Sequence, residues 1–373
     1  MNTGVYVHIP FCIRKCHYCS FNSIPYEKET AARYMDALSR EIDSCRNLRG
    51  ITSVYIGGGT PSIIPQHDLE ALLKRLNGKF DIAEGTEATL EANPGALHGL
   101  DLKKIRDGGI NRISLGVQSF DPDELIKLGR QHGIMEVGRS VKELREAGFK
   151  NLSLDLIYSI PGQDERKWKE SLEKAASLGP EHISIYDLSI EVGTRFYSEV
   201  KAGRLALPPE PVQVDMYLHA IEFLEGAGFH RYEISNFARP GYECAHNLNY
   251  WSVGEYISFG AGAHSYIDGK RTRNIEDVGR YIDTVTSGGR AAECEEALSA
   301  QDMIREFVML SLRKAEGLSL EEFRERFGRR FKELYGGKLD PLFRAGYLGE
   351  NKGYIYLTVK GILASNRVIT EFF

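Results

Sequence analysis

The chain is organised around Cys12-Ile13-Arg14-Lys15-Cys16-His17-Tyr18-Cys19, a loop that holds three cysteines in C-x3-C-x2-C spacing. It comes directly after the apolar run at residues 5–9. Thiolates are soft ligands of the kind that favour iron–sulfur clusters. A [4Fe–4S] cubane has four irons, so three thiolates leave one iron without a protein ligand. An open iron can chelate a substrate, and the spacing therefore favours catalysis over simple electron transfer.

Two other interpretations of the loop are a zinc site and three unrelated buried cysteines. Structural zinc takes four ligands, usually from two CxxC-like pairs, and no residue is placed to complete such a set. The C-x3-C-x2-C spacing is also similar to that of radical S-adenosylmethionine (SAM) enzymes. In those enzymes the open iron takes the amino and carboxylate groups of SAM, and an electron from the cluster cleaves the sulfonium.

Composition limits the class of protein. The 373 residues suffice for one large domain and a small one, and 42% hydrophobic with 27% charged residues is ordinary for a soluble globular protein. A net charge of −5 argues against nucleic acid as a partner. Six cysteines, half of them in one loop, suit a reducing cytoplasm better than a disulfide framework. We find no signal-peptide pattern and no membrane-spanning run, although peripheral membrane contact stays compatible with the sequence.

The first two-thirds of the chain alternates strand-like and helix-like segments. We expect strands at residues 5–9, 53–56, 87–91, 112–117, 151–157 and 182–188. We expect helices at residues 29–45, 68–76, 100–107, 136–147, 164–177 and 212–227. This α/β alternation predicts a parallel sheet with right-handed crossovers. Six units without a GxGxxG turn predict an open (β/α)6 barrel over residues 1–230, a partial relative of the TIM barrel, with its chemistry at the carboxyl ends of the strands.

Glycines and polar residues follow the ends of these strands. Gly57-Gly58-Gly59-Thr60-Pro61 lets the backbone approach a ligand closely, or forms only a strained turn. Glu91 can accept hydrogen bonds from a ligand, or form a surface salt bridge, and Gln118 lies at the rim. Arg130 can pair with a carboxylate as a bidentate fork, although arginine on a helix is more often solvated. Asp155 stands in an apolar run and needs a partner or a ligand.

Together these segments resemble the oxygen-independent coproporphyrinogen III oxidase superfamily. The matching motifs keep their order and spacing through residue 190, and they are Tyr6-Val7-His8-Ile9-Pro10-Phe11-Cys12, GGGTP, Glu91, Gly116-Val117-Gln118-Ser119-Phe120, Gly129-Arg130-Gln131-His132, Asp155-Leu156-Ile157 and Pro161-Gly162-Gln163. The resemblance implies that the cluster is bound by Cys12, Cys16 and Cys19. It also implies that SAM is surrounded by Tyr6, Gly58, Gly59, Thr60, Glu91, Gln118, Arg130 and Asp155.

Two departures distinguish branches of this superfamily. The true oxidase resembles C-x3-C-x2-C-x-C, whereas Phe21 occupies the position of the last cysteine here. The oxidase also carries a long amino-terminal extension before its Tyr-x-His-Ile-Pro strand, whereas only five residues precede Tyr6. Both features are similar to those of the heme chaperone branch, the HemW family.

Residues 231–298, expected as a connecting region, carry a second match to that branch. Cys244-Ala245-His246-Asn247-Leu248-Asn249-Tyr250-Trp251 contains H-N-x-x-Y-W, similar to the family's marker motif, and a glycine-rich stretch at residues 259–266 follows. His246 can offer an axial nitrogen to heme iron, with Tyr250 and Trp251 as flat apolar walls. The alternative is a histidine satisfied inside an aromatic cluster. A metal pair of Cys244 and His246 lacks further ligands.

Residues 299–373 predict a separate small domain of three helices, a hairpin and a final helical turn, which resembles a winged helix. DNA binding is not expected, because residues 301–373 hold 13 basic and 10 acidic residues, too mild an excess for a phosphate-binding face. The family resemblance implies a carboxyl-terminal cap domain instead.

The resemblance as a whole implies a radical SAM fold with a [4Fe–4S] cluster and SAM, in a protein that binds heme and passes it to an apo-hemoprotein acceptor, for instance in the respiratory chain. Flavodoxin or ferredoxin is the expected electron donor. Two alternatives stay open. One is oxidative decarboxylation of coproporphyrinogen III, which we do not expect from Phe21 and the short amino terminus. The other is a related radical SAM methyltransferase that uses two SAM molecules. No catalytic residue is assigned.

Overall fold

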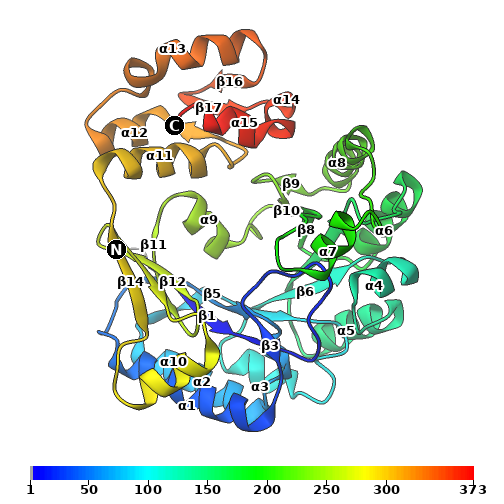
Figure 1. The fold of residues 1–373 in the computed structure, drawn as a ribbon, viewed down its shortest axis with the longest axis vertical. Helices are drawn as coiled ribbons and strands as arrows, with labels where there is room; N and C mark the ends of the chain where they lie inside the picture. Colours follow the sequence, from blue (N-terminus) through cyan, green and yellow to red (C-terminus); the bar gives the residue numbers. More distant parts are fainter. Residues whose placement is uncertain (1–2) are drawn as a thin grey trace.

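The computed structural model describes residues 3–373, and its main feature is a twelve-stranded sheet in the order β14-β13-β12-β11-β1-β4-β5-β6-β7-β8-β10-β9 (Figure 1). Six parallel neighbours form its middle, and they are β1 (Thr3–Ile9), β4 (Ile51–Gly58), β5 (Ile82–Ala92), β6 (Arg112–Gln118), β7 (Asn151–Tyr158) and β8 (His182–Asp187). These six strands are the ones expected from the sequence. The predicted open (β/α)6 fold of the radical SAM type is therefore confirmed.

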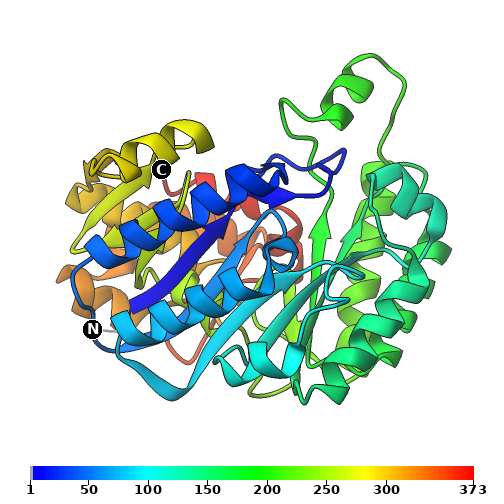
Figure 2. The ribbon, with the colours of Figure 1, turned by 90° about the horizontal axis from the view of Figure 1, so that it is seen from below.

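Helices cover the outer side of the curved sheet (Figure 2). They are α1 (Lys28–Ser44), α2 (Gln66–Lys79), α3 (Leu102–Asp107), α4 (Pro122–Leu128), α5 (Ile134–Glu146), α6 (Glu165–Ser177) and α8 (Glu210–Gly226). The short α7 (Arg195–Lys201) instead stands on a loop that projects beyond the sheet (Figure 2). Amphipathic spacing explains the long ones: on α2 the buried positions Leu69, Leu72, Leu73 and Leu76 recur every three or four residues. The short helices α4 and α7 were not expected. Among residues 3–373, no helix combines the length and the apolar character that crossing a bilayer demands.

The segment after α8 supplies both edges of the sheet. On one side β10 (Asn236–Ala238) runs antiparallel to β8 and is followed outward by β9 (His230–Arg231). On the other side β11 (Glu255–Phe259) lies parallel to β1, and β12 (His264–Ile267), β13 (Lys270–Asn274) and β14 (Ala292–Ala297) continue outward as antiparallel strands. Two helices accompany them, α9 (Ala245–Trp251) on the inner side and α10 (Val278–Thr286) against α1.

The carboxyl-terminal unit is helix-rich around a three-stranded sheet in the order β15-β17-β16. Its elements are α11 (Ala300–Ser311), β15 (Leu318–Ser319), α12 (Leu320–Phe327), α13 (Phe331–Arg344), β16 (Leu348–Asn351), β17 (Tyr354–Leu357), α14 (Val359–Leu363) and α15 (Ser365–Thr370). The unit packs on α9 and on the residues that follow it. The Arg313 guanidinium lies 5.7 Å from the centre of the Trp251 ring, and Arg326 donates to the carbonyls of Ser252 and Val253. The expected winged-helix-like shape is present.

Candidate functional site

The carboxyl ends of the parallel strands open on a cavity of about 390 Å³, which we call the cysteine cavity. Cys12, at the end of β2 (Phe11–Cys12), lines it together with Cys16 and Cys19 from the following loop. Seven of the eight residues expected around SAM line the same cavity, namely Gly58, Gly59, Thr60, Glu91, Gln118, Arg130 and Asp155. The eighth, Tyr6, lines a neighbouring cavity instead.

His17 holds the cysteine loop against the rest of the barrel. Its amide donates to the carbonyl of Leu128 at 3.0 Å, and its Nδ1 lies 2.8 Å from the carbonyl of Lys127. Its own carbonyl accepts from the amide of Phe196 at 2.9 Å, and Arg195 lies 3.0 Å from its Nε2. The loop is therefore clamped between α4 and the excursion that carries α7, and this explains a histidine between the second and third cysteines.

The sulfur atoms have polar neighbours inside the cavity. Arg130 donates from Nη1 to the sulfur of Cys16 at 3.5 Å, and the Thr60 hydroxyl donates to the sulfur of Cys12 at 3.8 Å. Burial raises the pKa of the thiols of Cys12 and Cys19. Metal binding there must displace their protons, because the thiolate is the ligand.

The glycine-rich turn after β4 runs along the backbone that leads into the cysteine loop. The amide of Gly59 donates to the carbonyl of Ile9 at 2.8 Å, and the amide of Thr60 donates to the carbonyl of Phe11 at 2.7 Å. A Cβ atom on Gly59 would lie 2.5 Å from the Phe11 oxygen, so no larger residue fits. Gly58 has a φ of 120°, which a side chain would strain.

Glu91, at the end of β5, is bound from two sides. The Tyr55 hydroxyl donates to Oε1 at 2.8 Å, and the amide of Gly58 donates to Oε2 at 3.1 Å. Burial raises the pKa of Glu91 to about 7. The two hydrogen bonds act to lower this pKa, but they offset only part of the effect of burial. Tyr55 was not singled out from the sequence. Its place three residues before Gly58, on the same strand, is a signal that could have found it.

Arg130 is half-buried, and several groups of the cavity wall hold its guanidinium in place. It donates from Nη2 to the carbonyl of Gly116 at 2.6 Å and to the side-chain oxygen of Asn93. Asn93 in turn donates to the Thr60 hydroxyl at 2.9 Å and was missed in the sequence, although it follows Glu91 closely. Within residues 3–373 the buried Nε of Arg130 finds no partner. That atom is closed off from solvent, so an acidic ligand group in the cysteine cavity would meet the Nη atoms of the guanidinium, and the residues present fit SAM.

Asp155 is held by serine hydroxyls from three strands. Its Oδ1 accepts from Ser153 at 3.1 Å and Ser184 at 2.7 Å, and its Oδ2 accepts from Ser114 at 2.9 Å. A carboxylate has about four acceptor sites, so one remains for a ligand. The serines were missed in the sequence, although they lie on the carboxylate's own strand and on both of its neighbours. Gln118, at the end of β6, has a φ of 69°, a conformation that non-glycine residues rarely adopt.

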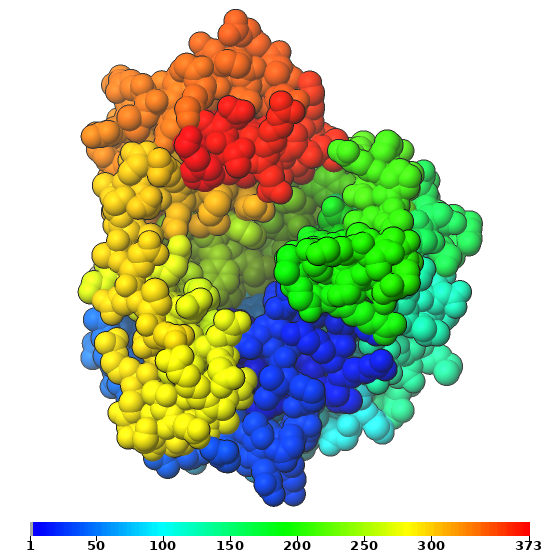
Figure 3. All heavy atoms as spheres, viewed as in Figure 1, coloured from blue at the N-terminus to red at the C-terminus, as the bar shows by residue number. Residues whose placement is uncertain are grey.

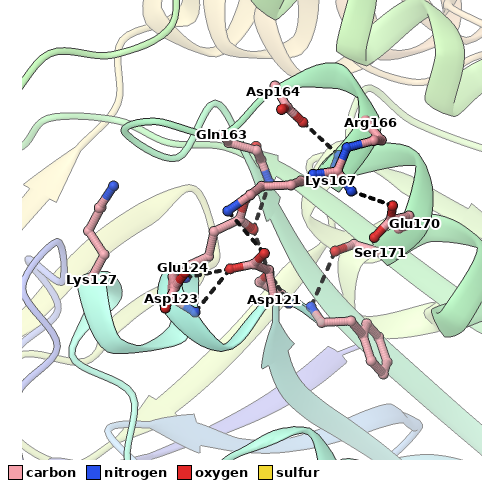
Figure 4. A network of polar contacts seen from close by, with 12 residues as sticks. Asp121, Asp123, Glu124, Lys127, Gln163, Asp164, Arg166, Lys167, Glu170 and Ser171 are labelled. Atoms are coloured by element: carbon pink, nitrogen blue, oxygen red, sulfur yellow. Dashed lines mark hydrogen bonds and ion pairs between the residues drawn. The ribbon is translucent and has the colours of Figure 1, made fainter.

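Two of the resemblance motifs, at residues 116–120 and 161–163, meet in a network of polar contacts (Figure 4). Buried Glu124 accepts from the Ser119 hydroxyl at 2.5 Å and from the Gln163 side chain at 3.0 Å. Asp121 caps α4 and pairs with Lys167 on α6 at 3.0 Å. This network joins the turns that follow β6 and β7 and so fixes the rim where Gln118 lies.

A second cavity, of about 530 Å³, adjoins the first, and we call it the tyrosine cavity. Four tyrosines line it, namely Tyr6, Tyr250, Tyr256 and Tyr266, together with Met309 and Leu310 of α11. Phe21, Gly58 and Glu91 line both cavities, so the two meet there. The Phe21 side chain is 68% exposed. A hollow at the centre of Figure 3 lies between the carboxyl-terminal unit, in orange and red, and the barrel.

His246 does not present a nitrogen to either cavity. Its Nδ1 lies 2.8 Å from the Ser53 hydroxyl, its Nε2 lies 2.9 Å from the Tyr250 hydroxyl, and the residue is 1% exposed. Its ring stacks on that of Tyr55, and burial lowers the pKa of His246 to about 3. Of the three residues expected at heme, Tyr250 lines the tyrosine cavity, whereas Trp251 packs under the carboxyl-terminal unit.

Cys244 has a structural partner. Its thiol donates to Oε1 of Glu87 at 3.3 Å, and the same carboxylate accepts from the amides of Ala245 and His246 at the start of α9. Within the described part of the chain, no three His, Cys, Asp or Glu side chains are grouped to hold a single ion. The three loop cysteines differ from such a group, because a cubane takes each thiolate on a different iron.

Comparisons with known proteins agree with this geometry. The sequence profile of the Radical SAM superfamily matches residues 6–175, and that of the HemN C-terminal domain matches residues 298–364. Heme chaperone HemW of Bacillus subtilis is 38% identical over 99% of this chain and 98% of its own. Heme chaperone HemW of Escherichia coli is 34% identical over 99% of this chain and 97% of its own.

A solved structure extends the likeness to the whole fold. Coproporphyrinogen III oxidase (HemN) of Escherichia coli, a radical SAM enzyme, superposes with a TM-score of 0.85 at 25% identity, over 100% of this chain and 90% of that one. The chain thus has the same architecture as the oxidase, whereas its sequence identity to the HemW proteins is higher. The chain belongs to the HemW family of heme chaperones, within the radical SAM superfamily.

Proposed function

We propose that this protein binds heme in the tyrosine cavity and passes it to an apo-hemoprotein acceptor. The observation that carries the proposal is the pairing of two adjoining cavities, one with three cysteines and one with four tyrosines. A volume of about 530 Å³ is within the range of cofactor sites, and aromatic walls suit the faces of a flat macrocycle. The relatives named as heme chaperones support heme as the occupant.

The cysteine cavity is the proposed seat of a [4Fe–4S] cluster and SAM. Cys12, Cys16 and Cys19 would hold the cluster, and the guanidinium of Arg130, which lines the cavity, would bind the SAM carboxylate through its Nη atoms. Asp155 keeps one acceptor site for a hydroxyl. When bound, the cluster and SAM supply one-electron chemistry. The chain's own part is to orient SAM and to limit access of water, because Arg130 and Glu91 are half-buried in the cavity wall.

Glu91 and its neighbours complete the proposed SAM site. Gly58 and Gly59 of the glycine turn line the cavity without side chains, so a ligand can approach their backbone closely. Glu91 would accept a hydrogen bond from the SAM amino group or ribose, and Gln118 would line the far rim. Tyr6 stands on the tyrosine side, with its hydroxyl 3.0 Å from Nδ1 of His8. Its proposed place is therefore the boundary between SAM and heme.

The proposed electron donor is a flavodoxin or ferredoxin that docks on the outer side of the cysteine loop. Arg14, Lys127 and Arg195 surround a shallow depression there. The apolar side chain of Ile126 is exposed at this depression, and that of Ile13 is exposed next to Arg14 in the chain. An acidic donor would meet complementary charge around an apolar contact, which aids encounter and fixes orientation.

We further propose a cytoplasmic protein with an acceptor in the respiratory chain and with peripheral membrane contact. All six cysteines are free thiols, as a reducing compartment favours. Val359 and Leu363 are exposed on α14, with Lys360 between them. Such apolar and basic neighbours suit a membrane surface.

The decisive experiment is a heme titration of the purified, anaerobically cluster-reconstituted protein, with a coproporphyrinogen III turnover assay in parallel. We expect one heme per chain and no protoporphyrinogen, even with dithionite and SAM. The control is the same preparation denatured and refolded without cluster reconstitution. Formation of protoporphyrinogen would make the protein an oxidase. Absence of heme binding would leave the methyltransferase alternative.

A further inference from the structure

Three histidines lie in or beside the tyrosine cavity, and they differ in what their nitrogens already bind. His8 lies 3.0 Å from the Tyr6 hydroxyl through Nδ1 and 2.8 Å from the carbonyl of Asn22 through Nε2. His246 is occupied at both nitrogens, as described above. His264, at the start of β12, lines the cavity and is exposed, and within residues 3–373 neither of its nitrogens makes a hydrogen bond.

Arg273 lies directly beside His264. The two residues are register partners in the antiparallel pair of β12 and β13, so their side chains lie on the same face of the sheet. The next arginine on that face, Arg271, is engaged with Glu306 by two contacts of 2.6 and 2.9 Å. Arg273 is exposed and forms no ion pair with any residue that the structure describes.

We propose that His264 is the protein ligand to heme iron and that Arg273 pairs with a heme propionate. This inference rests on the proposed function and names the residues that perform it. Imidazole nitrogen is a common axial ligand of heme iron. Guanidinium matches a carboxylate by two parallel hydrogen bonds. Heme offers both partners on one molecule, iron at its centre and carboxylates at its edge, and β12 and β13 present the matching groups side by side.

The rest of the cavity then has defined tasks. Tyr250, Tyr256 and Tyr266 supply flat surface, and Phe21 stands exposed where the two cavities meet. A phenylalanine exposed to 68% gains much by covering the macrocycle. His246 becomes a positioning residue, because its hydrogen bond fixes the Tyr250 hydroxyl.

The test compares single variants for binding of two porphyrins. Protoporphyrin IX without metal reports on the cavity alone, and heme adds the iron ligand. His264→Ala should weaken heme binding by about tenfold or more and change its Soret spectrum, while metal-free protoporphyrin binds as in the wild type. Free imidazole should restore the spectrum in His264→Gly. His67→Ala is the matched control, because the His67 side chain is exposed on α2, and this variant should resemble the wild type.

Each other outcome has one meaning. Wild-type heme spectrum and affinity in His264→Ala would overturn the ligand assignment and leave the proposed function intact. The ligand assignment is likewise overturned if His246→Ala removes the iron ligation while His264→Ala retains it. Equal loss of heme and metal-free protoporphyrin in His264→Ala would show a packing role and also overturn it. Failure of the wild-type protein to bind heme would instead overturn the proposed function.

Arg273→Ala should reduce heme affinity without changing the Soret maximum, and an unchanged affinity would remove Arg273 from the proposal.

Discussion

The ring of Tyr55 stacks on the imidazole of His246, with centroids 5.1 Å apart and planes inclined by 27°. The hydroxyl of the same tyrosine donates to Glu91 at 2.8 Å. Tyr55 is thus the contact through which helix α9, with the HNxxYW motif, reaches the carboxylate that both cavities share.

Replacing Tyr55 with phenylalanine should keep the stack and remove the hydrogen bond. We expect a loss of about 1–3 kcal/mol in the free energy of unfolding, because buried Glu91 loses a donor. SAM affinity should fall as well, since Glu91 is freed to turn. Denaturant unfolding and equilibrium dialysis measure the two effects. Tyr197→Phe, on α7 and outside both cavities, is the control, and equal results for the two variants would contradict the prediction.

Glu91 should make the stability of the protein without cluster or SAM depend on pH. Burial raises the pKa of Glu91 from 4.5 to about 7, so between these values the folded protein keeps a proton that the unfolded chain has released. Stability from this group therefore falls as pH rises through that window and stays low above it. Glu91→Gln lacks the titration. From pH 4.5 to 8 the gap between wild type and variant should change by up to about 3 kcal/mol, and parallel pH profiles would refute this.

Gly59→Ala and Gly78→Ala should have opposite effects. A Cβ at residue 59 meets the backbone of Phe11 at 2.5 Å, and backbone cannot yield cheaply. We expect a loss of about 1–3 kcal/mol and a lower cluster content. Gly78 lies in α2 with nothing within 4 Å of its added methyl group, so alanine should add about 0.5–1 kcal/mol. Thermal unfolding measures both stabilities, and similar changes in Tm for the two variants would contradict the close packing at Gly59.

The cysteine loop should carry the whole cluster. Reconstituted protein should hold about four irons and four sulfides per chain, as a cubane requires. The combined alanine replacement of Cys12, Cys16 and Cys19 should abolish the iron–sulfur absorption. Cys45→Ala should not, because Cys45 ends α1 outside both cavities. A triple variant that retained the absorption would disprove the cluster assignment.

Arg130 should contribute to SAM binding, and the spectrum of the reduced cluster reports that binding. Saturating SAM should alter the electron paramagnetic resonance spectrum of the wild-type protein. Arg130→Ala should weaken that binding by about 1.5–3 kcal/mol, the range for a hydrogen bond to a charged group. Arg166→Ala, which breaks only an exposed ion pair with Glu170, should leave it unchanged. Undiminished SAM affinity in Arg130→Ala would show that the guanidinium meets no ligand.

The sequence was sufficient to predict the six parallel strands and the helices between them other than α4, because strong local periodicity marks both. It also predicted that residues 58–60, 91, 118, 130 and 155 meet around the cysteines, since the carboxyl ends of parallel strands share one edge. Local pattern could not show the outer strands. The strand Ala292–Ala297 reads AECEEA, is mostly exposed and has almost no apolar signal.

The environment of single side chains was the other limit. His246 is sealed by Ser53, which lies 193 residues earlier in the chain, and by a tyrosine on its own helix. Tyr6 belongs to the cysteine motif in sequence but lines the tyrosine cavity, because β1 lies beside β11, whose Tyr256 borders that cavity. Both depend on which distant elements pack together, which spacing alone does not reveal.

The place of β1 has a consequence for how the protein is made. This strand pairs on one side with β4 and on the other with β11, where Thr3 lies opposite Glu255. One edge of β1 therefore stays open during synthesis until β11, which lies far later in the chain, has been made. An open, apolar edge attracts other strands. Until then the nascent chain carries its cysteine loop next to an unpaired strand edge, which exposes this segment to aggregation.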